Sequence, residues 1–348
     1  MKRIGKCLVA AILSIAMVFG LVPMFSGEAE AATKVFLSYS DFPVNAMGTN
    51  NAFNANVCVA SGVNLSSLQG WLAIKDATAL GYYWTYTYNG KTYKGNLKWM
   101  SRNDVKTVYG GYSSYSGYRL NDNSSISFSS VPAGRSVNLE IYATISPLGA
   151  VGRFTENIKI GTYKITVITK NNAVVYNARQ EYNAWRAASA EVQAAMKTKY
   201  FTTTCGYDMP GEAWCAAFAS YCVKTAGLSS YIDGGNVGCC ELLSACARTG
   251  NGSSYIANAD GKEDEIYKKV KPGDLVFFIG GQNIPGVTHH VGIVTQVRKA
   301  NGKVSIDYID GNNGAGAIGE VSGYKIDSKK TINGTAYKNI IGFGLLHN

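Results

Sequence analysis

The sequence contains little histidine. Among 348 residues there are three, His289, His290 and His347. No two cysteines are separated by two residues, and no acidic cluster has the spacing of calcium ligands. Structural zinc sites need such cysteine pairs or nearby histidines, so we expect no metal and no other cofactor. Long runs of Lys and Arg are absent as well, and we therefore expect no nucleic-acid binding.

Long hydrophobic runs are also scarce. The longest spans residues 7–25, follows three basic residues and precedes Ala29-Glu30-Ala31, which has the small-x-small pattern of a cleavage site. We interpret residues 1–31 as an export signal, with a mature chain that starts near Ala32. An uncleaved anchor is the alternative, but Gly20 and Pro23 inside the run favour cleavage. No second run of this length follows, so we expect no stable membrane span after cleavage and a secreted, extracellular or cell-wall associated protein.

Acidic residues are fewer than basic ones, at 23 against 33, which gives a net charge of +10. Cleavage of residues 1–31 would remove three basic and two acidic residues and leave +9. Outside a bacterium, such a chain is attracted to anionic wall polymers and lipid head groups. The C-terminus carries no sorting signal, so covalent attachment to the wall is not expected.

Residues 32–170 show the period of two that is typical of strands. Apolar and polar residues alternate over 137–145 and 84–88, and Asn89-Gly90 is a strong hairpin signal. Further strands are predicted at 34–39, 53–59, 68–74, 125–131 and 163–168. We expect an all-β antiparallel sandwich, and we recognise no family in this half.

Aromatic residues in this half suggest one function. Tyr109, Tyr112, Tyr115 and Tyr118 recur every third residue in a Gly/Ser-rich stretch, and residues 82–84 are Tyr-Tyr-Trp. Exposed aromatic rings can stack on sugars, which would make the region adhesive. The alternative, which we favour, is that the strand aromatics form the core and the loop tyrosines are ordinary surface residues.

Residues 173–348 combine helical and strand patterns, which predicts an α+β domain. The apolar spacing over 175–196 predicts one amphipathic helix, with Ser189 filling a gap in the pattern. A second helix is predicted between Pro210-Gly211 and Gly227. Strands are predicted at 274–279, 290–297, 304–309 and 340–346, and residues 228–270 are predicted as a glycine-rich loop region with two short helical patches.

The second of these helices begins at Cys215. Free backbone N–H groups and the helix dipole at this position favour thiolate over thiol, which makes a nucleophile. A thiolate nucleophile needs a proton carrier, and His289 and His290 open a predicted strand. Asp310 and Asn312 follow the next strand and would share one face of an extended chain, so either one could orient the imidazole.

Four motifs in this order resemble a known family. They are WCAAF at 214–218, PGDLVFF at 272–278, HVGIV at 290–294 and DGNN at 310–313. Residues from about 175 to 348 resemble a CHAP domain, the cysteine, histidine-dependent amidohydrolase and peptidase family. The resemblance implies a papain-like fold with Cys215 as nucleophile, His290 as base, and Asp310 and Asn312 as the orienting pair. Many members have Glu where this chain has Asp310. The related NlpC/P60 family fits less well after the histidine.

The same resemblance implies a substrate. Similar domains cut peptidoglycan at an amide bond through a thioester, as muramoyl-L-alanine amidases or as endopeptidases of stem and cross-bridge peptides. Two alternatives stay open, an exported cysteine peptidase that acts on proteins and a wall-binding adhesive protein with an inactive CHAP domain. Each predicts a different outcome with sacculi and with protein substrates.

The remaining cysteines have structural interpretations. Cys58 and Cys222 fit small core positions, whereas Cys205, Cys239, Cys240 and Cys246 could form one or two bridges.

Overall fold

The structure is a computed structural model, and it describes residues 36–41, 56–66, 68–108, 111–112, 114–148, 155–248, 252–279 and 287–347. The predicted export signal lies outside these residues and stays a prediction, as does the domain boundary between residues 170 and 173. Strands dominate the described residues and form sheets of eight, six and two strands. No helix in these ranges combines the length and the apolar character needed to cross a membrane.

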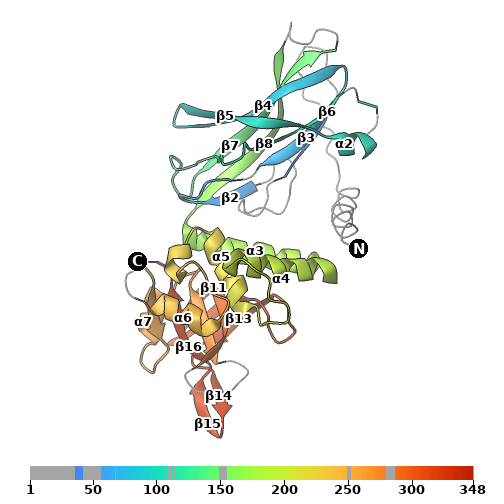
Figure 1. Cartoon of the computed structure of the whole chain (residues 1–348). Helices are drawn as coiled ribbons and strands as arrows, with labels where there is room; N and C mark the ends of the chain where they lie inside the picture. The colour runs from blue at the N-terminus through green and yellow to red at the C-terminus, as the bar shows by residue number, and fades with distance from the viewer. Residues whose placement is uncertain are drawn as a thin grey trace. The chain divides into compact units, whose positions relative to one another are not determined.

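The first half of the chain forms one curled sheet of eight strands, in the order β1-β3-β6-β5-β4-β7-β8-β2 (Figure 1). These strands are β1 (Phe36–Asp41), β2 (Asn56–Ala60), β3 (Gln69–Ile74), β4 (Ala77–Tyr88), β5 (Lys91–Ser101), β6 (Ser114–Arg119), β7 (Ser136–Pro147) and β8 (Glu156–Ile168), with helix α2 (Asn103–Val108) before β6. The first seven residues of β5 pair with β4 and its last four residues pair with β6, so the sheet is continuous through β5. The predicted strand-rich fold is confirmed. That these strands form a two-layer sandwich remains a proposal.

The strand pairing departs from the prediction in two places. Every pair in the described part of this sheet is antiparallel except β2 with β8, which is parallel, so the prediction of a purely antiparallel sheet is wrong there. Residues 125–131 were predicted as a strand, but they form turns with a single bridge between Ile126 and Leu65. Ile126 and Val131 are buried nonetheless, and their apolar spacing explains the prediction.

Local chemistry explains the central hairpin. Asn89 and Gly90 have φ angles of 49° and 74°, the left-handed conformation that a two-residue hairpin turn requires.

The tyrosines considered as an adhesive surface are not all exposed. Tyr118 lies in β6 and is fully buried, and Tyr82 is buried with its hydroxyl 2.6 Å from Ser116 Oγ. Tyr109 lies outside the described residues. The core interpretation therefore holds for Tyr82, whereas the prediction of a surface position for Tyr118 is wrong.

Helices come first in the second half of the chain. They are α3 (Lys170–Ala187), α4 (Ala190–Cys205), α5 (Cys215–Thr225), the 3-10 helix η1 (Ser229–Ile232), α6 (Cys239–Ala247) and α7 (Glu263–Lys269). The single helix predicted over 175–196 is wrong, because α3 and α4 meet there. Ser189 does not fill a gap in a helical pattern; its hydroxyl accepts the Val192 N–H and caps α4, as Thr169 caps α3.

A sheet of six strands lies beside these helices, in the order β13-β12-β11-β10-β16-β9. Its strands are β9 (Ser254–Ala257), β10 (Leu275–Ile279), β11 (Thr288–Ala300), β12 (Lys303–Asp310), β13 (Gly319–Lys325) and β16 (Ile340–Leu345), with a separate hairpin of β14 (Lys329–Ile332) and β15 (Thr335–Lys338). Every residue of β10 is buried because both faces are covered. Phe277 packs in the core that contains α5, and Phe278 packs in the opposite core.

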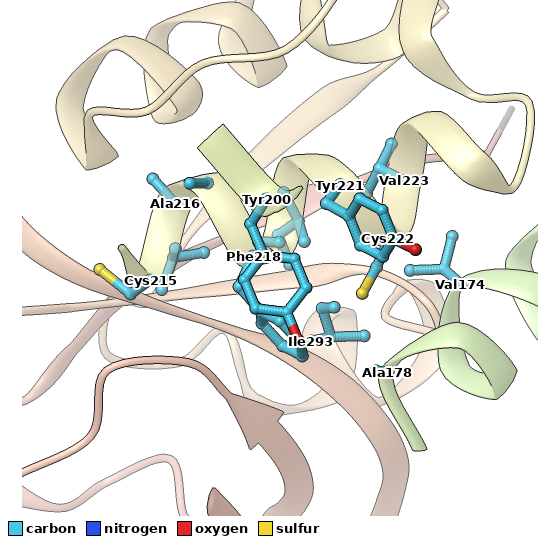
Figure 2. Packing of buried hydrophobic residues seen from close by; sticks show 14 of the residues in the cluster. Val174, Ala178, Tyr200, Cys215, Ala216, Phe218, Tyr221, Cys222, Val223 and Ile293 are labelled. Carbon is cyan, nitrogen blue, oxygen red and sulfur yellow. The ribbon is translucent and has the colours of Figure 1, made fainter. Parts of the chain in front are cut away.

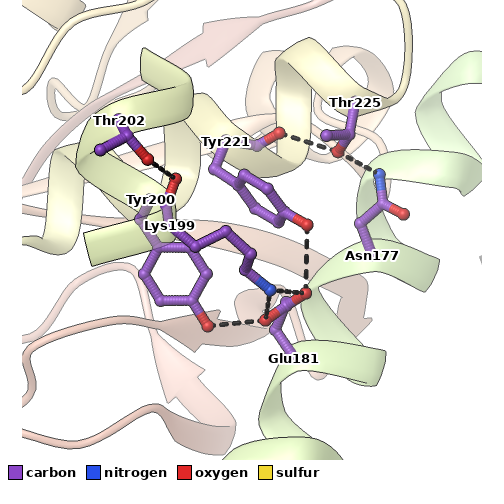
Figure 3. Close-up of polar contacts among 7 residues, drawn as sticks. All are labelled: Asn177, Glu181, Lys199, Tyr200, Thr202, Tyr221 and Thr225. Carbon is purple, nitrogen blue, oxygen red and sulfur yellow. Dashed lines mark hydrogen bonds and ion pairs between the residues drawn. The ribbon is translucent and has the colours of Figure 1, made fainter. Parts of the chain in front are cut away.

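A polar cluster joins the three long helices (Figure 3). Glu181 on α3 forms an ion pair of 2.7 Å with Lys199 on α4. The same carboxylate accepts the hydroxyl of Tyr200 at 2.7 Å and that of Tyr221, on α5, at 3.3 Å. Tyr200 in turn packs against Trp214 and Phe218, the residues that flank the start of α5. The cluster therefore fixes the position of the helix that carries Cys215.

We expect Glu181→Ala to lower the free energy of unfolding by about 3–5 kcal/mol. The substitution leaves the Lys199 charge and two tyrosine hydroxyls without their shared partner in a largely dry environment. Exposed Glu212 is a matched control, because its side chain has no polar contact among the described residues. Glu212→Ala should stay within about 0.5 kcal/mol of the wild type in urea denaturation. Equal effects of the two substitutions would refute a structural role for the cluster.

Candidate active site

Helix α5 begins at Cys215 with its backbone donors free. Trp214 occupies the N-cap position and makes no side-chain hydrogen bond to the helix, so the first N–H groups are available. The indole of Trp214 instead stacks on Trp185, with ring centroids 5.1 Å apart. Figure 2 shows the buried face of α5 against Ile293, with Cys215 at one end of the cluster and Cys222 within it. The sequence thus places one sulfur at the helix start and another in the core.

Strands β11 and β12 supply an imidazole and a carboxylate. Asp310 pairs with Gly292 across the two strands, and His290 precedes Gly292 by two residues on the same face. This register brings His290 Nε2 to 2.8 Å from Asp310 Oδ2. The Asp310 side chain is only 5% exposed, whereas that of His290 is 23% exposed. The ring therefore has a buried anchor and an open side.

The Cys215 side chain lies next to the start of β11, close to where β12 ends. Its Sγ lies 4.0 Å from the carbonyl oxygen of His289, and the nearby His290 ring and Val291 N–H help to lower the pKa of its thiol. Since Nε2 of His290 is taken by Asp310, Nδ1 is the ring nitrogen that remains for the sulfur. Sulfur, imidazole and carboxylate thus form a continuous chain, Cys215–His290–Asp310.

Electrostatics in this chain favour the charged forms of the first two groups. A hydrogen bond from Cys239 outweighs burial and, with His290 and the Val291 N–H, lowers the pKa of Cys215 to about 5. Burial lowers the pKa of His290, but the hydrogen bonds to Asp310 and Cys215 outweigh it and raise that pKa to about 9. Between these values the pair is thiolate and imidazolium.

The other predicted residues lie elsewhere. Asn312 has a φ of 54°, so the extended chain stops after Asp310 and the two side chains do not share a strand face as predicted. His289 contributes its backbone carbonyl, and His347 bonds to Asp274 at 3.2 Å. The described residues contain no cluster of three His, Cys, Asp or Glu side chains able to hold a metal ion.

Two features near Cys215 were not predicted from the sequence. Cys239 begins α6, in the region predicted as a loop with two short helical patches, and its Sγ lies 3.4 Å from Cys215 Sγ. All seven cysteines in the described ranges are free thiols. Gly311 follows Asp310, and a Cβ there would lie 2.7 Å from a ring carbon of Trp214 and 2.8 Å from Phe218 Cβ. The glycine lets the end of β12 approach the start of α5.

Gly311→Ala is therefore expected to lower the free energy of unfolding by about 1–3 kcal/mol, because the new methyl group overlaps two packed rings. Gly314 is the matched control, since a Cβ there would meet nothing within 4 Å. Gly314→Ala should change the stability by less than about 0.5 kcal/mol in the same denaturation series. If both variants unfold at the same denaturant concentration, close approach at Gly311 is not required.

The ionisation of Cys215 gives a second prediction. A lowered pKa means that thiolate is present above about pH 5 and is lost as the pH falls through that value. We expect the rate of Cys215 alkylation by iodoacetamide, followed by peptide mass spectrometry, to titrate with a midpoint near pH 5 instead of the ordinary 9.0. His290→Ala should move the midpoint upward. A wild-type midpoint near 9 would contradict the hydrogen-bonded chain.

Comparisons with known proteins agree with this geometry. Residues 206–312 match the family model of the CHAP domain. The match confirms the resemblance predicted from the four motifs, and the stretch contains Cys215, Cys239, His290, Asp310 and Asn312. The CHAP match begins at residue 206, so the eight-stranded sheet lies outside it.

Whole-chain comparisons add little to the CHAP match. No curated protein matches the sequence. Among solved structures, an engineered protein aligns at 12% identity and a TM-score of 0.18 over 39% of this chain, which spans 20% of that protein's length. The structure of NlpC1 from Trichomonas vaginalis aligns at 10% identity and a TM-score of 0.21, over 91% of this chain and 95% of that one.

Proposed function

We propose that the protein is an exported peptidoglycan hydrolase that cleaves an amide bond by a Cys-His-Asp mechanism. The observation that carries this proposal is the chain Cys215–His290–Asp310, in which the imidazole hydrogen-bonds to the buried carboxylate and lowers the pKa of the cysteine at the first residue of α5. The CHAP match supports a hydrolase related to peptidoglycan. The two more specific activities that fit this proposal are those of a muramoyl-L-alanine amidase and of a stem and cross-bridge endopeptidase. Both would use the same chemistry.

The first half of the reaction forms a thioester. The Cys215 thiolate attacks the amide carbonyl, and the backbone N–H of Cys215 at the helix start donates to the oxyanion. His290, as imidazolium, gives its proton to the leaving amine as the C–N bond breaks. His290 can act both as imidazolium and as neutral imidazole in this step, because its ring lies between the sulfur and a buried carboxylate.

The second half of the reaction releases the acyl group. His290, now neutral, takes a proton from water, and the resulting hydroxide attacks the thioester carbonyl. The tetrahedral intermediate collapses with loss of the Cys215 thiolate, which restores the starting pair. Asp310 accepts the Nε2–H of His290 throughout and keeps the ring in the tautomer and orientation that the sulfur needs.

The rest of the chain fits an exported wall enzyme. Residues 1–31 would direct export, residues 32–170 would form a β-sandwich accessory domain, and residues 173–348 would form a papain-like catalytic domain. The net charge of +9 after cleavage would hold the protein near anionic wall polymers.

The proposal is tested with two substrates. Purified sacculi incubated with the protein should lose turbidity and release soluble fragments, whereas casein should stay intact. Cys205→Ser is the matched control, because the Cys205 thiol donates to the carbonyls of Phe201 and Tyr207 and a hydroxyl can do the same. This variant should clear sacculi at the wild-type rate. Digestion of casein without clearing would select a cysteine peptidase, and binding to sacculi without hydrolysis would select an inactive adhesive protein.

A further inference from the structure

We propose that Cys215 and Cys239 form a reversible redox site, in which oxidation by hydrogen peroxide joins the two sulfurs in a disulfide and masks the nucleophile. The carrying observation is the 3.4 Å between the two Sγ atoms, which come from the first residues of two different helices. Disulfide formation itself needs no hydrolytic activity. Its effect on catalysis rests on the function proposed above.

The geometry allows the bond to form with little movement. A disulfide has a sulfur–sulfur length of about 2.05 Å, so the two atoms need to approach by about 1.4 Å. Cys215 lies at the start of α5 and Cys239 at the start of α6, where no preceding helical turn surrounds either side chain. Rotation about the side-chain bonds can therefore supply most of the approach.

The pairing is selective among the described cysteines. Cys240 is exposed and donates its thiol to the Thr288 carbonyl at 3.2 Å. Cys205 bonds within the end of α4, and Cys222 lies two turns further along α5, buried in the core. Within the described residues, Cys239 is the one cysteine whose sulfur lies in hydrogen-bond range of the Cys215 sulfur. An oxidised Cys215 therefore meets Cys239 first.

The chemistry takes place in two balanced steps. The Cys215 thiolate attacks one oxygen of hydrogen peroxide, an S–O bond forms, the O–O bond breaks, and the released hydroxide takes a proton from the His290 imidazolium. The Cys239 sulfur then attacks the sulfenic sulfur, the S–O bond breaks, and the Cys239 proton leaves with the hydroxide as water. Two thiols and one peroxide thus give one disulfide and two waters.

Cys215 is only 2% exposed, so peroxide would have to approach the sulfur beside the His290 ring, which keeps 23% of its side chain exposed. Once formed, the disulfide removes the attacking electron pair from Cys215 and stops hydrolysis. It also prevents further oxidation to sulfinic acid, which thiols do not reverse. A small thiol that attacks the bridge would restore the nucleophile. The disulfide would therefore keep the enzyme inactive under oxidising conditions, and its reduction would restore hydrolysis.

The test uses the purified full chain, reduced, freed of reductant and treated with hydrogen peroxide. Peptide mapping should show one cross-link, between the Cys215 and Cys239 peptides, in the wild type and in Cys240→Ser, and none in Cys239→Ser. Hydrolysis of sacculi by the oxidised wild type should fall at least about tenfold and return with dithiothreitol. Oxidised Cys239→Ser should stay inactive after the same reduction, because its Cys215 passes on to sulfinic acid.

The outcomes separate this inference from the proposed function. A cross-link without any hydrolysis by the reduced protein would support the redox site and overturn the hydrolase. Hydrolysis by the reduced protein with no Cys215–Cys239 cross-link would overturn the redox site alone. A cross-link from Cys215 to Cys240, or full recovery of oxidised Cys239→Ser with dithiothreitol, would also overturn it.

Discussion

Cys215→Ala should lower the rate of hydrolysis of sacculi at least about 10⁴-fold, because no covalent intermediate can form without the sulfur. The variant should remain folded. The Cys215 side chain is small, and it lies at a helix end, outside the interlocked ring contacts of Trp214, Tyr200 and Phe218. Thermal unfolding within a few degrees of the wild type would show that the loss is chemical.

Cys205→Ser provides the comparison for this substitution, since it also removes one thiol from the same half of the chain. It should retain wild-type hydrolysis. A Cys215→Ala protein that still clears sacculi at more than about one hundredth of the wild-type rate would mean that another group attacks the amide.

Asp310→Ala should lower hydrolysis about 10²- to 10³-fold. The substitution removes the only acceptor that the structure gives to His290 Nε2 among the described residues, so the ring loses its tautomer and its orientation. Because Asp310 also raises the pKa of His290, the alkaline limb of the activity profile should move from near pH 9 to lower pH. Rates measured between pH 5 and pH 10 would show both effects.

Two further variants separate orientation from charge. Asp310→Asn keeps an acceptor oxygen for the ring but loses the charge, so we expect a smaller loss than for Asp310→Ala, together with the shifted alkaline limb. Asn312→Ala should stay within about threefold of the wild type, since the structure ends the strand before Asn312. A larger loss from Asn312→Ala than from Asp310→Ala would assign the orienting role to the amide.

The sequence could predict the members of this chain because each one lies at or near the end of a regular element. Pro210-Gly211 and the apolar spacing place the start of α5 at Cys215, and the apolar run after His290 predicts β11. Both signals are local. The choice between Asp310 and Asn312 was not local, because it depends on where β12 stops, and the positive φ of Asn312 is not visible in an alternation pattern.

Contacts between distant segments could not be predicted in this way. Nothing in the spacing of Cys215 and Cys239 indicates that two helices begin side by side. Similarly, Gly311 looks like an ordinary turn residue until Trp214 and Phe218 are found within 3 Å of its missing Cβ. Ser189 misled the helix prediction for a related reason, since a serine can fill a helical position or cap the next helix, and the backbone decides between them.

The most direct measurement is mass spectrometry of the fragments released from purified sacculi by the wild type and by Cys215→Ala. The chain Cys215–His290–Asp310 predicts fragments with a new carboxyl or amino terminus at one amide bond, released by the wild type and absent with the variant. Fragments cut only at glycosidic bonds, or the same amide cleavage with Cys215→Ala, would contradict it.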